Sequence, residues 1–115
     1  MNDNARQLYQ IKAQVLQAIA HPLRLAIVDC LATGEQCVCD IAAHVAAQRS
    51  NVSRHLALMN AAGVVASRKD GLKVLYRLNC PCLASFFACV DQVLLNRMRE
   101  ASTLLESLEH TAQTT

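Results

Sequence analysis

The sequence predicts a mainly α-helical domain that carries one small β-hairpin. Hydrophobic residues make up 53% of the 115 residues and aromatic residues only 3%, so the core must consist mostly of Leu, Val, Ile and Ala, which favours helices. Apolar side chains recur at helical spacing in successive segments. An Asp70-Gly71 pair separates two β-prone runs, which predicts the hairpin. The length indicates a single domain over residues 1–115.

Two helices are expected before the first glycine. The first covers residues 5–20, where apolar side chains repeat on one face, and it should end at His21 because the residue before a proline disfavours helix. Pro22 suits the first turn of the second helix, which should run to about residue 33. Gly34 then closes it.

Two shorter helices and the hairpin follow. A third helix is expected from residue 39 or 40 to 46, and a fourth from an N-cap at Ser50 to about residue 62, where Gly63 stops it. Strands at 64–69 and 72–78 should form the hairpin. With a last helix after it, this order of elements is that of a winged helix-turn-helix.

The last helix, opened by residues 79–82, has an apolar stripe that is broad and long for one small core. Its members are Leu83, Phe86, Phe87, Val90, Val93, Leu94, Met98, Leu104, Leu105 and Leu108. The first and last helices would bury their spare apolar faces best against a second copy. We therefore expect a homodimer built on these two helices.

The third and fourth helices fit a helix-turn-helix that reads DNA. Polar side chains fill the first turns of the fourth helix, where a recognition helix meets bases and phosphates: Ser50, Asn51, Ser53, Arg54 and His55. Arg54 is expected to pair with guanine and Asn51 with adenine. Three apolar residues should face the core: Val52, Leu56 and Met59. The hairpin adds a basic wing suited to phosphates, consisting of Arg68, Lys69 and Lys73. The predicted partner is double-stranded operator DNA.

Six cysteines raise the question of what the thiols do. No apolar run approaches the roughly 20 residues of a membrane span, and the polar N-terminus has no signal-peptide core, so a cytoplasmic location is expected. A disulfide framework is not expected in that reducing compartment. Thiolates select soft ions, so Cys37 and Cys39, two residues apart at the start of the third helix, are predicted metal ligands.

Trivalent arsenic and antimony favour three thiolates, and two arguments make Cys80 or Cys82 the candidate for the third. In winged helices the residues before the third helix often pair with the second wing strand, which these two cysteines follow directly. Both cysteine pairs also lie at predicted helix N-termini, where the helix dipole favours thiolate.

The other cysteines and two histidines have simpler expected roles. Cys89 follows Cys82 by seven residues, so Cys80, Cys82 and Cys89 could form a separate three-thiol site. For Cys30 and Cys89 a small buried hydrophobe is the favoured interpretation. A helix-boundary and a surface role, without ligand function, are expected for two histidines, His21 and His44.

Four segments carry a family resemblance: residues 21–27 (HPLRLAI), 35–40 (EQCVCD), 52–56 (VSRHL) and 62–65 (AGVV). Together they resemble the ArsR/SmtB family of metal-responsive winged-helix repressors over roughly residues 16–78. The resemblance implies a homodimeric repressor whose DNA affinity falls when an inducer binds. The CVC segment is similar to that of arsenic/antimony and cadmium/lead sensors. We therefore predict a repressor released from its operator by As(III) or Sb(III), with Cd(II) or Pb(II) as alternative inducers.

The chain departs from the metal-sensor patterns of that family. Arsenite sensors often carry a third cysteine where this chain has Ala42, and cadmium/lead sensors use N-terminal thiols, whereas residues 1–29 contain no cysteine. Zinc and nickel sensors use Asp and His on the last helix, where this chain has one histidine, His110. The third thiolate must therefore come from elsewhere in the chain.

The same residues allow other functions. A redox or persulfide switch of the same fold would use Cys30 and Cys89. A thiol enzyme would rely on C-x-C and C-P-C, which are weak motifs, and the chain lacks a thioredoxin-like C-x-x-C and any phosphate-cradling glycine loop. We therefore expect no enzyme activity and no small-molecule substrate. An architectural DNA binder would leave the six cysteines without a role.

Overall fold

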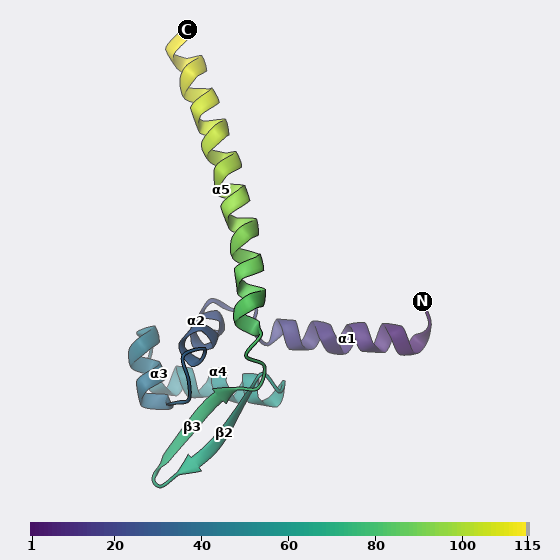
Figure 1. Cartoon of the computed structure of the whole chain (residues 1–115), viewed down its shortest axis with the longest axis vertical. Coiled ribbons are helices and arrows are strands. Elements are labelled where there is room, and N and C mark those ends of the chain that lie inside the picture. The colour runs from purple at the N-terminus through teal and green to yellow at the C-terminus, as the bar shows by residue number, and fades with distance from the viewer. Residues whose placement is uncertain (115) are drawn as a thin grey trace. The chain divides into compact units, whose positions relative to one another are not determined.

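The computed structural model describes residues 1–114 and has the winged helix-turn-helix order that the sequence predicts (Figure 1). Its elements are α1 (Asp3–Gln17), α2 (Pro22–Leu31), β1 (Gln36–Cys37), α3 (Val38–Val45), α4 (Arg49–Ala61), β2 (Val65–Asp70), β3 (Lys73–Leu78) and α5 (Leu83–Thr114). The chain divides into two units, Met1–Pro81 and a second unit that begins at Cys82. The first unit holds the helix-turn-helix and the wing, and the second consists of α5.

The boundary between α1 and α2 is fixed by caps and by one buried side chain. Helix α1 ends at Gln17, earlier than predicted, because the chain turns there to bury Ile19, which is 4% exposed. Helix α2 begins at Pro22, and the Nδ1 atom of His21 accepts a hydrogen bond from the Leu23 N–H at 3.0 Å. The predicted boundary role of His21 is confirmed.

The helix-turn-helix differs from the prediction by single residues. Helix α3 begins at Val38 with Cys37 in the N-cap position, and it ends at Ala46 in a left-handed conformation, with φ of 54°. Helix α4 begins at Arg49 after Gln48, so the predicted N-cap role of Ser50 is wrong and Ser50 lies in the first turn.

A three-stranded antiparallel sheet with the order β1-β3-β2 carries the wing. Cys37 pairs with Leu75, which confirms the expected pairing of this segment with the second wing strand. The hairpin turn is Gly71-Leu72, one residue later than predicted, because Asp70 pairs with Lys73. Gly71, with φ of 65°, takes the first turn position, which matches a type II′ turn and spares Asp70 a positive φ.

The core lies between α2, α3, α4 and the base of the wing. The side chains that are 0% exposed are Ile27, Val28, Ile41, Val52, Leu56, Met59 and Val65. The predicted inward orientation of Val52, Leu56 and Met59 is therefore confirmed. Since all three lie on α4, this packing holds the opposite side of α4 toward solvent.

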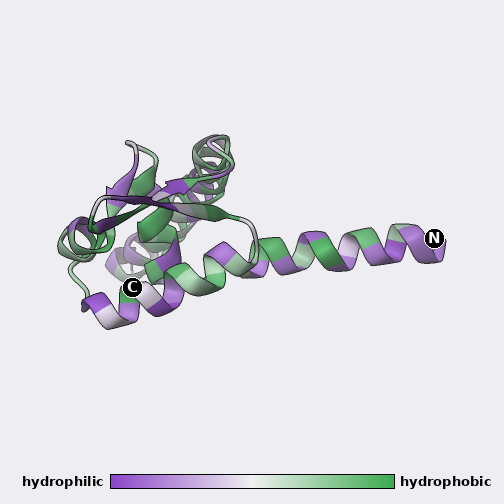
Figure 2. Cartoon of the chain, turned by 90° about the horizontal axis from the view of Figure 1, so that it is seen from below, coloured by the Kyte–Doolittle hydropathy of each residue, from purple (hydrophilic) through white to green (hydrophobic). Residues whose placement is uncertain are grey.

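Helices α1 and α5 each carry exposed apolar side chains. Helix α1 has no buried residue, and Leu8 is 57% exposed. On α5, Val93 is 58% and Leu108 67% exposed. Figure 2 shows apolar bands recurring along α1. Within residues 1–114, no helix combines the length and apolar character needed to span a bilayer.

Candidate DNA interface and thiol pocket

The outer side of α4 presents most of the predicted DNA-reading residues. Ser50, Ser53 and Arg54 are exposed and Asn51 is half-buried. The Nη2 atom of Arg54 donates a hydrogen bond to Asn51 Oδ1 at 2.7 Å. The two residues predicted to read bases therefore form a pair one helical turn apart, opposite the buried face of the helix.

His55 differs from these four residues because it faces α2. It is half-buried, and its Nδ1 atom accepts a hydrogen bond from Nη1 of Arg24 at 3.2 Å. The rings of His21 and His55 lie 4.5 Å apart between centroids. Burial, followed by the nearby His21, Arg24 and Arg54, lowers the pKa of His55 below its ordinary value. The structure therefore gives His55 a partner within the protein, and its predicted contact with DNA stays a prediction.

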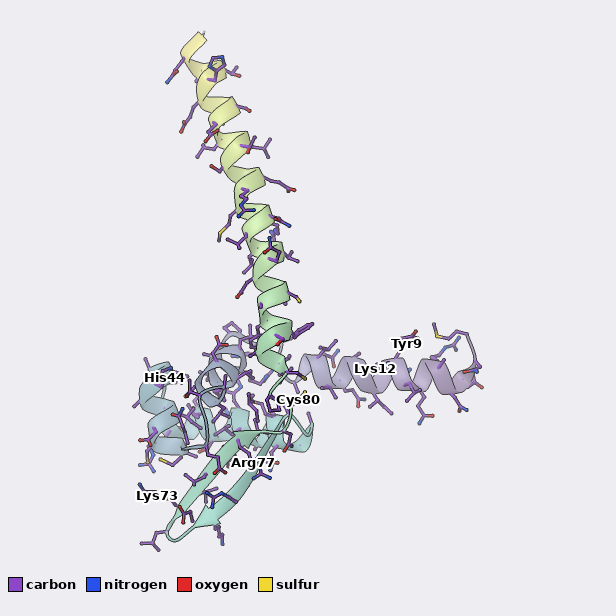
Figure 3. The ribbon with its side chains drawn as sticks, viewed as in Figure 1. Tyr9, Lys12, His44, Lys73, Arg77 and Cys80 are labelled. Carbon is purple, nitrogen blue, oxygen red and sulfur yellow. The ribbon has the colours of Figure 1, made fainter. Side chains whose placement is uncertain are left out.

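The wing carries its three predicted cations, and one of them, Arg68, forms an ion pair within the protein. Lys69 and Lys73 are exposed, and Figure 3 shows Lys73 near the tip of the wing. Arg68 forms an ion pair with Glu35: its Nε lies 2.9 Å from Oε2, and its Nη2 donates to Oε1 at 2.9 Å. Hydrogen bonding to Arg68 lowers the pKa of the Glu35 carboxyl. A phosphate would therefore compete with Glu35 for this guanidinium.

Two further cations belong to this surface and were missed by the sequence analysis. Arg49 is the exposed first residue of α4, directly before the predicted reading residues. Arg77 is exposed on β3, two residues beyond Leu75, which pairs with Arg68. Side chains alternate along a strand, so Arg68 and Arg77 share one face of the wing. Arg77 lies four residues after Lys73, on the same face of the predicted strand, and this spacing is the signal that could have identified it.

A pocket of about 340 Å³ joins the C-x-C segment to the DNA-reading elements. It is lined by Cys37, Val38, Cys39, Asp40, Arg49, Leu72, Lys73 and Val74. Cys37 is buried at 8% exposure and Cys39 is exposed, so the thiols lie at different depths of one pocket. Two soft donors at one pocket fit a thiophilic ion. The start of α4 and the tip of the wing complete the lining.

The structure does not assemble the third thiolate. Among residues 1–114, no three or more Cys, His, Asp or Glu side chains are grouped so that they could hold a metal ion. Cys80 lies in the turn after β3 and Cys82 directly before α5, and both are exposed. Their ligand role stays a prediction.

The remaining thiols divide into one buried and one exposed residue. Cys30 is 1% exposed at the end of α2, where its Sγ donates to Gln36 Oε1 at 3.3 Å, and burial raises the pKa of its thiol. Its predicted burial is confirmed. The predicted burial of Cys89 is wrong, because Cys89 is exposed on α5. His44 is exposed, as expected.

The fold, the polar outer side of α4 and the basic wing define a winged helix-turn-helix DNA-binding regulator. Residues 21–67 match the family model of the bacterial regulatory proteins of the arsR family. An uncharacterized HTH-type transcriptional regulator of Mycobacterium tuberculosis is 32% identical over 102 residues, which cover 88% of this chain and 90% of the relative. The chain belongs to the arsR family of transcriptional regulators, so the interpretation as a thiol enzyme is set aside.

Two further relatives extend the comparison. An arsenical resistance operon repressor of Staphylococcus aureus is 34% identical over 88 residues, covering 76% of this chain and 78% of the relative. A solution structure of the homodimeric winged helix-turn-helix DNA-binding domain of a possible ArsR-family regulator from Mycobacterium bovis superimposes with a TM-score of 0.74. That domain is 30% identical, and the match covers 87% of this chain and 93% of the domain.

Proposed function

We propose that this protein is a cytoplasmic transcriptional repressor that trivalent arsenic or antimony releases from its operator by binding to Cys37 and Cys39. The observation that carries the proposal is the shared pocket. Its lining joins both thiols to Arg49 at the start of α4 and to Lys73 on the wing. The S. aureus relative, named as an arsenical resistance operon repressor, supports the choice of inducer.

The repressor binds DNA as a homodimer in this proposal. The exposed apolar faces of α1 and α5 form the dimer interface, and the homodimeric M. bovis domain supports this assembly. The two recognition helices then enter successive major grooves about 34 Å apart. On each helix the base-facing residues are Ser50, Asn51, Ser53 and Arg54. The phosphate-facing residues of each wild-type wing are Lys69 and Lys73. The ion pair with Glu35 keeps Arg68, the third predicted phosphate contact, from the DNA.

The thiol chemistry balances without a redox step. Each cysteine thiol forms one sulfur–arsenic bond with As(OH)₃, and its proton leaves with one hydroxide as water. Cys37 and Cys39 supply two of these bonds, and Cys80 or Cys82 supplies the third. Since each thiol proton leaves as part of a water molecule, ligation of the neutral thiols releases no net proton.

Ligation moves the elements that carry the two ligands. Cys37 ends β1 and Cys39 lies in the first turn of α3, which packs against α4. Drawing the two sulfurs toward a third thiolate shifts α3 against the recognition helix. A coupling free energy of about 1–3 kcal/mol lowers DNA affinity by roughly 5–150-fold.

Fluorescence anisotropy of the reduced protein on its own promoter DNA tests the proposal. As(III), Sb(III), Cd(II), Pb(II) and Zn(II) are added in turn, and release by the trivalent ions is expected. The double variant Cys37→Ser/Cys39→Ser should bind DNA and resist release. The matched control Cys89→Ser, at an exposed cysteine that does not line the pocket, should respond like the wild type.

The same assay assigns the third ligand and the inducer class. Loss of the response in Cys80→Ser or Cys82→Ser alone identifies the third thiolate. Release by Cd(II) or Pb(II) without release by As(III) would replace the proposed inducer. A thiol double variant that still releases DNA at the wild-type dose would refute the proposed site.

A further inference from the structure

Arg24 connects the end of α1 and the recognition helix to α2. Its Nη1 atom contacts His55 Nδ1 at 3.2 Å, and its Nη2 atom donates to the carbonyl oxygen of Gln17, the last residue of α1, at 3.4 Å. The Nε atom is buried and has no hydrogen-bond partner among residues 1–114. Holding a guanidinium between three helices with one N–H donor unsatisfied costs folding free energy. This cost indicates that the position of the Arg24 side chain matters.

The contact with His55 depends on the protonation of the imidazole. A guanidinium only donates hydrogen bonds, so Nδ1 of His55 must accept, and the ring is then neutral with its proton on Nε2. The ring of His21 lies beside that of His55 at an interplanar angle of 40°, and Nδ1 of His21 accepts from the Leu23 N–H.

The charged surroundings of His55 oppose a second proton on the ring. Burial lowers the pKa of His55 most, and the charges of His21, Arg24 and Arg54 lower it further. On α2, Asp29 is exposed. The other elements packed against α4 are α3 and β2, whose titratable groups are exposed: Cys39, Asp40, His44, Arg68, Lys69 and Asp70.

We propose that Arg24 and His55 are positioning residues for DNA reading, which tie the recognition helix to α1, and that protonation of His55 releases this tie. His55 directly follows Arg54, so a rotation of α4 at this point displaces the paired Arg54 and Asn51. The proposal rests on the DNA-reading role of α4 and does not depend on an inducer.

The sign of the pH effect separates this proposal from simple electrostatics. A proton on His55 adds positive charge, which by itself strengthens attraction to phosphate. Release of the Arg24 contact instead lowers affinity for the operator, because the reading side chains lose their fixed orientation. Operator affinity therefore falls on acidification, whereas affinity for unrelated DNA does not.

The test compares operator and non-operator duplexes by fluorescence anisotropy, on the full-length reduced protein without inducer. The pH runs from about 8 to about 4.5, well below the ordinary histidine value of about 6.5, because the pKa of His55 is lowered. Wild-type operator affinity should fall by about fivefold, the lower end of typical couplings between sites. His55→Gln keeps an acceptor for Arg24 but cannot titrate, so its affinity should not change with pH. The matched control His44→Gln should keep the wild-type profile.

Variants at α2 complete the design. Arg24→Gln should reduce operator affinity at all pH values while its folding is monitored by circular dichroism, and Arg24→Lys should restore part of it. His21→Asn retains a good N-cap residue, and the operator affinity of this variant should still fall on acidification. The proposal is overturned if wild-type operator affinity is constant or rises on acidification, if His55→Gln shows the same fall, or if His21→Asn abolishes it.

Discussion

The ion pair between Glu35 and Arg68 predicts a gain of DNA affinity on removal of a carboxylate. In the structure, Arg68 donates to both oxygens of Glu35, with Nε–Oε2 and Nη2–Oε1 distances of 2.9 Å. The substitution Glu35→Gln removes the anionic partner and leaves the guanidinium available to phosphate. Because Arg68 remains charged in either state, the variant should bind DNA more tightly, and the gain should be largest at low salt.

The magnitude follows from counterion release. Each additional phosphate contact steepens the slope of log K against log salt concentration by about 0.9, so the two Arg68 side chains of a dimer add about 1.8. A tenfold rise in salt should then cost the variant about 60-fold more affinity than it costs the wild type.

Anisotropy titrations at four or more salt concentrations measure this slope. The matched control is Asp29→Asn, which makes the same change in net charge at an exposed position of α2. The reasoning is refuted if Glu35→Gln has the wild-type slope, or if Asp29→Asn steepens the slope equally.

Three further predictions concern stability and thiol reactivity. Leu56 is 0% exposed, so Leu56→Ala should lower the free energy of unfolding in urea by about 2–5 kcal/mol. Leu58 on the same helix is 54% exposed, so Leu58→Ala should lower it by less than about 0.5 kcal/mol. Similar losses in the two variants would contradict the assigned core. Folding lowers the pKa of His55, so His55 contributes to the free energy of unfolding above its unfolded pKa of about 6.5. This contribution is lost as the pH falls through the pKa of the folded state, and His55→Gln should flatten this part of the curve of stability against pH. Native-state alkylation followed by mass spectrometry should label the exposed Cys39 well before Cys30, because burial of Cys30 raises its pKa and blocks access, and early labelling of Cys30 would contradict this order.

Local pattern was sufficient for most elements of the fold, and failed where packing sets a boundary. The inward face of α4 followed from helical spacing, since Val52, Leu56 and Met59 are all 0% exposed. The start of α4 did not follow, because Ser50 is the better N-cap by its chemistry, whereas the helix begins at Arg49 without a side-chain cap.

Only those parts of the candidate site that are contiguous in the sequence could be predicted. The C-x-C segment and the first turns of α4 are each read from a few adjacent residues. The contacts between Arg24 and His55 and between Glu35 and Arg68 join residues 31 and 33 positions apart, and no local pattern in the sequence links the members of either pair. Only tertiary packing reveals that two of the cations are held by internal partners.

The position of β1 provides a second route for the proposed inducer signal. Cys37 pairs with Leu75 on the wing, and Glu35, two residues earlier, holds Arg68. Movement of the C-x-C segment therefore acts on the wing directly, as well as on α4 through α3. If the ion pair carries part of the signal, Glu35→Gln should reduce the ratio of operator affinities measured without and with As(III), while Asp29→Asn leaves that ratio at the wild-type value. An unchanged ratio in Glu35→Gln would show that the Glu35–Arg68 ion pair carries none of the signal, because the substitution removes this contact and keeps Cys37 and Cys39 in place.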